Sequence, residues 1–228
     1  MKKFFTRMTA LLTAAVITAF AAVSCDDKDE WDKKAKDEHN LAGGDLDDDV
    51  NVDLEQMPYG AEYQKLLPDE YDTPLGVDRD PRYLSDEESA KFADYFYAIS
   101  ARDPKYLEKA LHPDFLKYVL ETSGFSTAQE FLDNEYELIK QYTGSDFEFT
   151  FVLVDGIMKN TDVTGLEAYD ARLEKAMPNA KVTDKKAFMI NCTYSKPNDN
   201  GSYSLQMRLG DYVTLCIYTI DGEPYVIF

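Results

Sequence analysis

Five oxygen-bearing side chains alternate along one short stretch of the chain and could together bind a cation. They have the spacing of the ligands in a calcium-binding loop: Asp45, Asp47, Asp49, Asn51 and Asp53. Val50 stands where such a loop needs glycine for its turn, and Gln56 stands where it needs a bidentate glutamate. We therefore interpret the run as a solvated acidic spacer and predict no metal site.

Catalysis by proton transfer or nucleophilic attack needs a histidine, a cysteine or an inward carboxylate in a matched arrangement. His112 precedes a proline at a predicted helix junction, where a ring usually caps the backbone or packs on a neighbour, and His39 lies in the acidic stretch. Glu148 lies on the strand face opposite a row of phenylalanines. The sequence shows no glycine-rich phosphate loop and no zinc-spaced cluster. We predict no catalytic residue and no cofactor.

Tyrosines on the predicted strands are a second candidate for chemistry, because an aromatic ring with a polar tip suits ligand binding. The residues are Tyr194, Tyr203, Tyr212, Tyr218 and Tyr225. The alternative, which we favour, is that they cover the half-exposed side of a sheet.

Cys192 and Cys216 could form a disulfide outside the cytoplasm. The predicted strand pairing places them two strands apart, about 9 to 10 Å. A disulfide needs Cα atoms within about 7 Å. We therefore favour two small buried thiols.

Helices dominate the first half of the folded part. Capping residues, prolines and apolar periodicity predict helices over about 86–101, 104–111, 115–123, 127–143 and 165–177. Ser85 with Glu88, and Ser126 with Gln129, have the spacing of capping boxes.

Strands dominate the second half. Alternation predicts strands over about 147–154, 182–194, 203–209, 212–218 and 225–228. Phe147, Phe149, Phe151 and Leu153 are expected on one face of the first. Helices followed by mainly antiparallel strands predict an α+β domain in which helices cover a curved sheet.

Three stretches carry a resemblance to the NTF2-like cone fold over residues 85–228. They are the helix Ala90 to Ile99, the run from Asp103-Pro104 to Leu111-His112-Pro113-Asp114-Phe115, and the end Asp221-Gly222-Glu223-Pro224-Tyr225-Val226-Ile227. The helix at 165–177 is an insertion relative to that family. The resemblance implies a cleft between helices and sheet. Some members, the steroid isomerases and small dehydratases, place an aspartate or a histidine there for proton transfer, and many bacterial envelope lipoproteins are similar.

The N-terminus has the features of an export signal. Lys2, Lys3 and Arg7 precede an apolar run of about 14 residues, too short to span a bilayer. Ala22-Val23-Ser24-Cys25 resembles the lipobox of bacterial lipoproteins, in which the cysteine is acylated and becomes the mature N-terminus. We predict lipidation at Cys25, with cleavage after Ala21 as the alternative.

Charge separates the tether from the domain. The chain has 24 basic and 43 acidic side chains, which excludes nucleic acid as a partner. Residues 26–80 contain 19 of the acidic and six of the basic ones. We predict a signal peptide at 1–24, an acidic flexible tether at 25–80 that docks from about 57, and a domain at 81–228.

These features predict a protein held on a bacterial membrane, outside the cytoplasm, by acyl chains on Cys25. We expect its domain to bind a protein or a small ligand without catalysis. The alternatives are an isomerase or dehydratase with a buried carboxylate, and a purely structural envelope protein.

Overall fold

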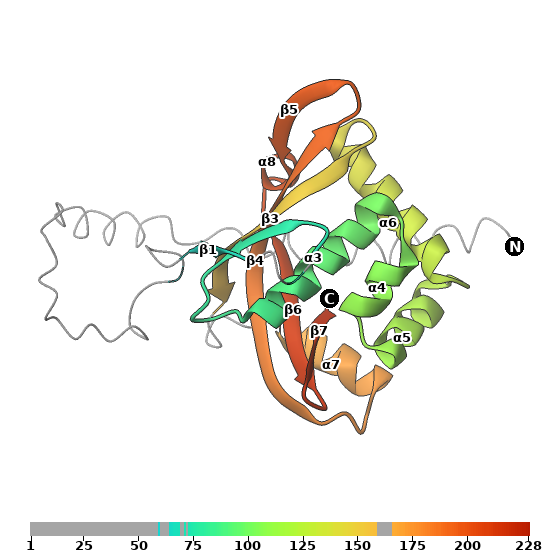
Figure 1. Ribbon diagram of the computed structural model, residues 1–228. Coiled ribbons are helices and arrows are strands. Elements are labelled where there is room, and N and C mark those ends of the chain that lie inside the picture. The colour runs from blue at the N-terminus through green and yellow to red at the C-terminus, as the bar shows by residue number, and fades with distance from the viewer. Residues whose placement is uncertain (1–58, 60–63, 69–70, 72, 159–165) are drawn as a thin grey trace, which may run out of the picture. The chain divides into compact units, whose positions relative to one another are not determined.

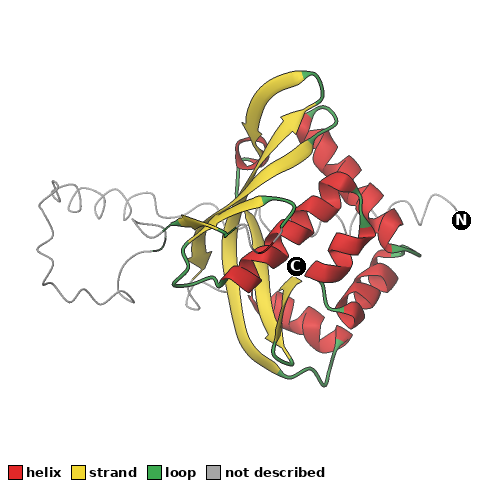
Figure 2. Ribbon diagram, in the orientation of Figure 1, coloured by secondary structure: helices red, strands yellow, loops and turns green. Residues whose placement is uncertain are grey.

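The computed structural model describes residues 59, 64–68, 71, 73–158 and 166–228. In this part the fold is α+β, with six helices and a seven-stranded, mostly antiparallel sheet (Figures 1 and 2). The predicted class is confirmed. The predicted signal peptide, Cys25, His39 and the acidic run from Asp45 to Asp53 lie outside the described residues.

The first four described helices begin at capping residues. They are α3 (Asp86–Ala101), α4 (Pro104–Ala110), α5 (Pro113–Ser123) and α6 (Ala128–Thr143). The predicted box of Ser85 and Glu88 is present at the start of α3. The box predicted at Ser126 and Gln129 is wrong by one residue. Thr127 is the N-cap and accepts from the Glu130 N–H at 3.1 Å.

These helices lie together on one side of the sheet (Figure 2). Aromatic rings join the two layers. Phe92 packs edge-on against Phe188 with ring centroids 5.8 Å apart, and Phe96 packs on Phe149 at 5.6 Å. Each fully buried phenylalanine stabilises the fold by about 1.5 to 3 kcal/mol. These two ring contacts therefore hold α3 on the sheet.

The sheet follows the order β1 (Lys65–Leu66), β2 (Gly76–Arg79), β3 (Glu148–Met158), β4 (Val182–Lys196), β6 (Val213–Ile220) and β7 (Glu223–Ile227), with β5 (Asp199–Ser204) paired to β4. Among the strands of the described residues, only β2 and β3 pair in parallel. Neither β1 nor β2 is predicted from the sequence. Both are too short to show alternation, and Val77 is the only buried apolar residue in β2.

A β-bulge makes the predicted inward face of β3 wrong beyond Phe149. The pairing with β4 shifts register between Phe149 and Phe151, so one extra residue reverses the alternation. Val152 and Val154 are buried, whereas Phe151 and Leu153 are half-buried.

The strand predicted over 203–209 is also wrong. β5 ends at Ser204, whose hydroxyl accepts from the Met207 N–H at 3.3 Å and starts the short helix α8 (Leu205–Leu209). Because β5 stops early, β6 pairs directly with β4, and Cys216 lies opposite Ala187. Cys192 lies opposite Val152. Both thiols are buried and free, as predicted, but the predicted separation of two strands is wrong, because β4 and β6 are neighbours.

The closing hairpin forms as predicted. Ile220 pairs with Glu223 across a two-residue turn in which Asp221 has φ 54° and Gly222 has φ 96°. Such turns need positive φ at both positions, which Asp-Gly provides. Among the described helices, none is long and apolar enough to cross a membrane.

Candidate functional site

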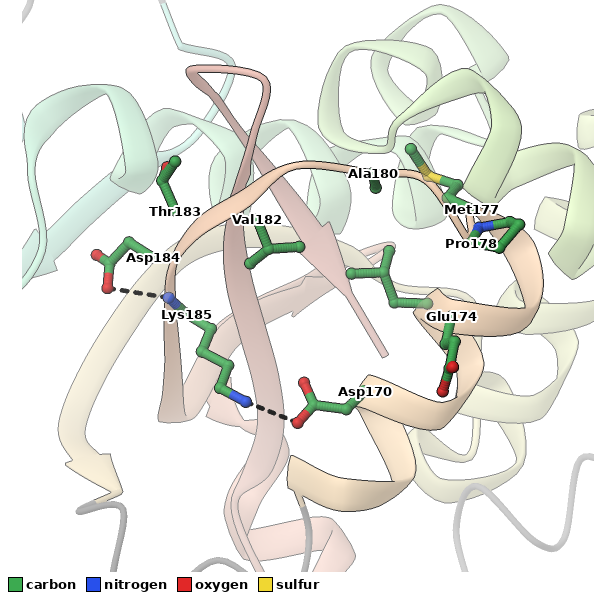
Figure 3. Close-up of a pocket in the computed structure, with 10 residues that line it drawn as sticks. Asp170, Glu174, Met177, Pro178, Ala180, Val182, Thr183, Asp184 and Lys185 are labelled. Carbon is green, nitrogen blue, oxygen red and sulfur yellow. Dashed lines mark hydrogen bonds and ion pairs between the residues drawn. The ribbon is translucent and has the colours of Figure 1, made fainter.

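The described surface has an open groove between α7 (Leu166–Ala176) and the first residues of β4 (Figure 3). Its volume is about 580 Å³. Pro178 follows the helix and turns the chain toward β4, so helix and strand form opposite walls. Apolar side chains form much of the surface: Leu173, Met177, Pro178, Ala180 and Val182. Leu173 is buried, whereas Val182 is 38% exposed.

Asp170 organises one end of the groove. The Lys185 ammonium lies 2.6 Å from one carboxylate oxygen, and the Tyr218 hydroxyl donates to the other at 2.7 Å. Burial alone would raise the pKa of Asp170, but the bonds from Lys185 and Tyr218 outweigh it and hold that pKa below its usual value. Asp170 is therefore ionised, and it neutralises the lysine nearest the groove.

Asp184 and Glu174 provide the remaining carboxylates. Lys186 Nζ lies 3.2 Å from Asp184 and 2.7 Å from the buried Glu88 of α3, so it bridges them. Glu174 follows Asp170 by one helical turn and is exposed. It makes no ion pair or hydrogen bond with any described residue. The groove thus has one carboxylate, that of Glu174, that no group of the described residues neutralises.

A further carboxyl, away from the groove, lies in the helical layer. Glu135 is half-buried on the inner face of α6, one turn after the buried Phe131 and one turn before Ile139. Burial raises its pKa to about 7, against a small opposing effect of the Asn134 amide 3.4 Å away. Burial also raises the pKa of the Tyr95 hydroxyl, and the charge of Glu135 adds to that shift.

Sequence reasoning missed Glu135 because it looked for inward acids on strands alone. The signal was present, since residues four apart share a helix face and Phe131 and Ile139 flank this glutamate.

Aromatic rings fill the interior near the end of β7. The Phe228 ring lies 5.4 Å from Tyr95, 5.8 Å from Phe115 and 6.1 Å from Phe131, between centroids. A ligand would have to displace Phe228 to take its place among these rings.

His112 has a structural role. Its Nδ1 accepts from the Asp114 N–H at 3.2 Å as the N-cap of α5, and its ring packs edge-on against Tyr225 at 5.0 Å. The predicted packing on a neighbour is present.

Replacing His112 by alanine should lower the free energy of unfolding by about 1 kcal/mol, because α5 loses its N-cap. Urea denaturation measures this loss. His112→Asn, which restores a capping acceptor, should recover part of it, and equal stability of both variants would show that the cap contributes nothing.

The tyrosines and Glu148 form no shared site. Tyr194 and Tyr218 are fully buried, whereas Tyr203, Tyr212 and Tyr225 are half-buried. The prediction that all five cover a half-exposed side of the sheet is therefore wrong for Tyr194 and Tyr218. Glu148 is exposed, consistent with a solvated side chain.

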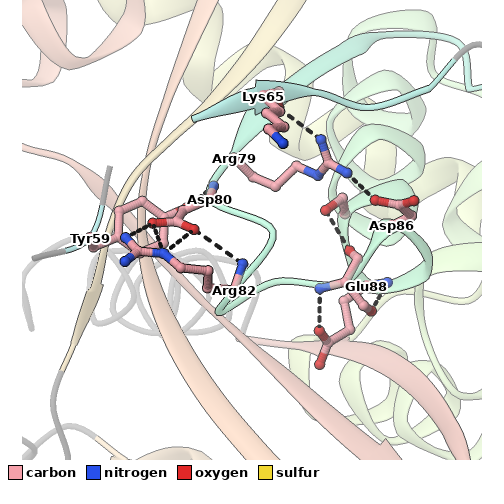
Figure 4. Close-up of polar contacts among 9 residues, drawn as sticks. Tyr59, Lys65, Arg79, Asp80, Arg82, Asp86 and Glu88 are labelled. Carbon is pink, nitrogen blue, oxygen red and sulfur yellow. Dashed lines mark hydrogen bonds and ion pairs between the residues drawn. The ribbon is translucent and has the colours of Figure 1, made fainter. Parts of the chain in front are cut away.

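A separate set of charges joins β2 to the start of α3 (Figure 4). The buried Arg79 donates to the Lys65 carbonyl at 2.7 Å and pairs with Asp86. Asp80, also buried, accepts from Arg82 Nε at 2.9 Å. Removing one partner of such a pair leaves a buried charge uncompensated, so we interpret this network as structural.

No family model, curated protein or solved structure matches this chain. Within the described residues, no group of three or more histidine, cysteine or acidic side chains could hold a metal ion.

Proposed function

We propose that this protein is a lipid-anchored, extracytoplasmic binding protein of the bacterial envelope, and that the groove between α7 and β4 is its binding site. The observation that carries the proposal is the groove itself. Its volume of about 580 Å³ falls within the roughly 300 to 1,000 Å³ of small-molecule sites. Its lining has five apolar and four charged side chains. Apolar surface can hold a ligand body, and charged groups can orient it.

The anchor is proposed from the sequence. Ala22-Val23-Ser24-Cys25 ends a short apolar run that follows Lys2, Lys3 and Arg7. Acyl chains on Cys25 would hold the protein on a membrane, and the acidic residues that precede β1 would serve as its tether, because β1 and β2 already belong to the sheet.

An NTF2-like domain is part of the same proposal. Four helices precede the long strands, and they lie on one side of a mostly antiparallel sheet (Figure 1). This arrangement supports the resemblance carried by residues 85–228.

Binding fits the groove better than catalysis does. A general acid or base works best when its pKa lies near the operating pH. The pKa of Asp170 is instead lowered by Lys185 and Tyr218, and neither a histidine nor a cysteine lines the groove.

Site-specific photo-crosslinking in intact cells tests the binding site. A photoreactive residue in place of Thr183, in the groove, should give a covalent adduct. The same residue in place of the exposed Glu121, on α5, is the control and should give none. Adducts that are absent at both positions, or equal at both, would contradict the proposal.

One observation favours a second candidate, an enzyme of the isomerase or dehydratase type. Glu135, with its pKa of about 7, could exchange a proton near neutral pH. This candidate needs a ligand beside the carboxyl, so it predicts that substrate binding shifts the titration of Glu135 in a carbon-detected NMR experiment. A titration unchanged by any tested ligand would leave the carboxyl without a catalytic role.

A further inference from the structure

We propose that the groove between α7 and β4 binds a small protonated primary amine that carries an apolar body. This inference rests on the proposed function, because it names the ligand class of the same groove. The amine would lie with its ammonium toward Glu174 and its body against Val182 and the helix-end residues (Figure 3).

Both walls of the groove present apolar side chains to a ligand. Val182 is 38% exposed at the start of β4, and Leu173 lies across from it on α7. Met177 and Ala180 extend this surface along the turn between helix and strand. A ligand body that covers Val182 removes apolar surface from water on both sides, which favours binding.

The charge of the groove selects a cation. Three carboxylates line it, those of Asp170, Glu174 and Asp184. Lys186 pairs with Asp184 at 3.2 Å. Lys185 is already held by Asp170 at 2.6 Å, so its charge is not free to attract an anion. Glu174 is left without a protein partner among the described residues. An ammonium is its natural complement, and the chain's net charge of −19 disfavours anions further.

The size of the groove selects a small molecule over a protein partner. A specific protein interface buries about 800 Å² on each side, far more than this groove offers. Its volume of about 580 Å³ suits a compact ligand. Glu174 and the exposed Val182 both belong to the lining of this groove.

The test uses 2-phenylethylamine with two matched probes, 2-phenylethanol and 3-phenylpropanoate. They carry the same ring on an ammonium, a hydroxyl or a carboxylate. Amide NMR spectra of the full chain carrying Cys25→Ser would follow each titration. The amine should shift amides of residues 170–185 and saturate with a Kd of about 1 mM, the range expected for a ligand of this size. The alcohol should bind at least about threefold more weakly, and the carboxylate should not saturate, because each loses the ion pair.

Two matched variants locate the ammonium. Glu174→Gln should weaken amine binding about threefold and leave binding of the alcohol unchanged, because the glutamine removes charge and little else. Glu167→Gln removes an exposed carboxylate from the same helix outside the groove and should leave both affinities unchanged. Val182→Ser should weaken both probes alike.

An alcohol that binds as tightly as the amine would overturn this proposal, as would equal effects of Glu174→Gln and Glu167→Gln. The crosslinking result distinguishes an error in the ligand class from an error in the binding site. If the amine does not bind but Thr183 still gives an adduct in cells, the ligand class is wrong and the binding site stands. If both fail, the groove is not the binding site.

Discussion

Replacing Cys25 by alanine should move the protein from the membrane fraction to the soluble fraction. Each buried methylene of an acyl chain contributes about 0.8 kcal/mol to membrane binding, and two or more chains make the attachment stable. The variant has no thiol to acylate at this position, so it loses that attachment altogether. Immunoblots of washed membranes and of the supernatant measure the redistribution.

A matched control separates lipidation from a general defect in export. Ser24→Ala keeps a small residue before the cysteine and should leave the protein on the membrane. Cys25→Ala protein that stays on membranes after washes with high salt and carbonate would contradict the anchor.

Replacing Glu135 by glutamine should stabilise the domain at pH 8 by up to about 3 kcal/mol. The pKa of this carboxyl is about 7 in the folded protein, against an ordinary value of 4.5. Each unit of difference corresponds to about 1.4 kcal/mol between the two protonation states. At pH 8 the wild-type fold must hold a charge in a poorly solvated place, and the neutral amide removes that cost.

The sign of the pH dependence follows from the same shift. Between about pH 4.5 and pH 7 the folded state binds a proton that the unfolded state has lost, so stability falls as the pH rises through this window. Below about pH 4.5 the carboxyl is protonated in both states, so Glu135 contributes nothing to the pH dependence of stability. The wild-type chain should therefore lose stability from pH 5 to pH 8, whereas Glu135→Gln should lose much less.

Urea denaturation at pH 5 and pH 8 measures both effects. Glu137→Gln is the control, because Glu137 lies on the same helix with a side chain that is 63% exposed. Equal pH dependence of the wild-type chain and Glu135→Gln would show that the carboxyl is well solvated. A stabilised variant would also mean that the wild-type chain keeps this acid at a cost, which favours a functional role for it.

The helices could be predicted because their ends are encoded locally. Ser85, Asp103 and Gly144 each mark a boundary that the structure uses. A cap depends on residues three or four positions away, so a single sequence carries the whole signal. The exception is the start of α6, because Ser126 and Thr127 can both act as an N-cap and the structure has Thr127 there.

The sheet was harder to predict because its pairing depends on distant residues. β2 has four residues and becomes a strand by pairing with β3, some 75 positions later in the chain. The bulge after Phe149 likewise arises from the register with β4, and no residue type in β3 signals it. The alternation of Tyr203, Leu205, Met207 and Leu209 favours a strand, but Ser204 caps a helix there, and Met207 is left 80% exposed.

The candidate site lay beyond sequence reasoning for a related reason. Asp170 and Lys185 are 15 residues apart, and only the turn from α7 into β4 brings them together. Glu174 and Val182 are ordinary residues of a helix and a strand until that turn places them in one groove. Glu135 differs, because its spacing from Phe131 and Ile139 on one helix face is visible in the sequence.

The mass of the mature N-terminal peptide, measured on protein extracted from membranes, tests the anchor most directly. If Cys25 is lipidated, the peptide begins at Cys25 and carries the added mass of acyl chains. Hydrolysis of the ester-linked chains would then remove part of that added mass. A peptide that begins at Ala22 with an unmodified cysteine would show ordinary cleavage after Ala21 and would contradict the lipid anchor.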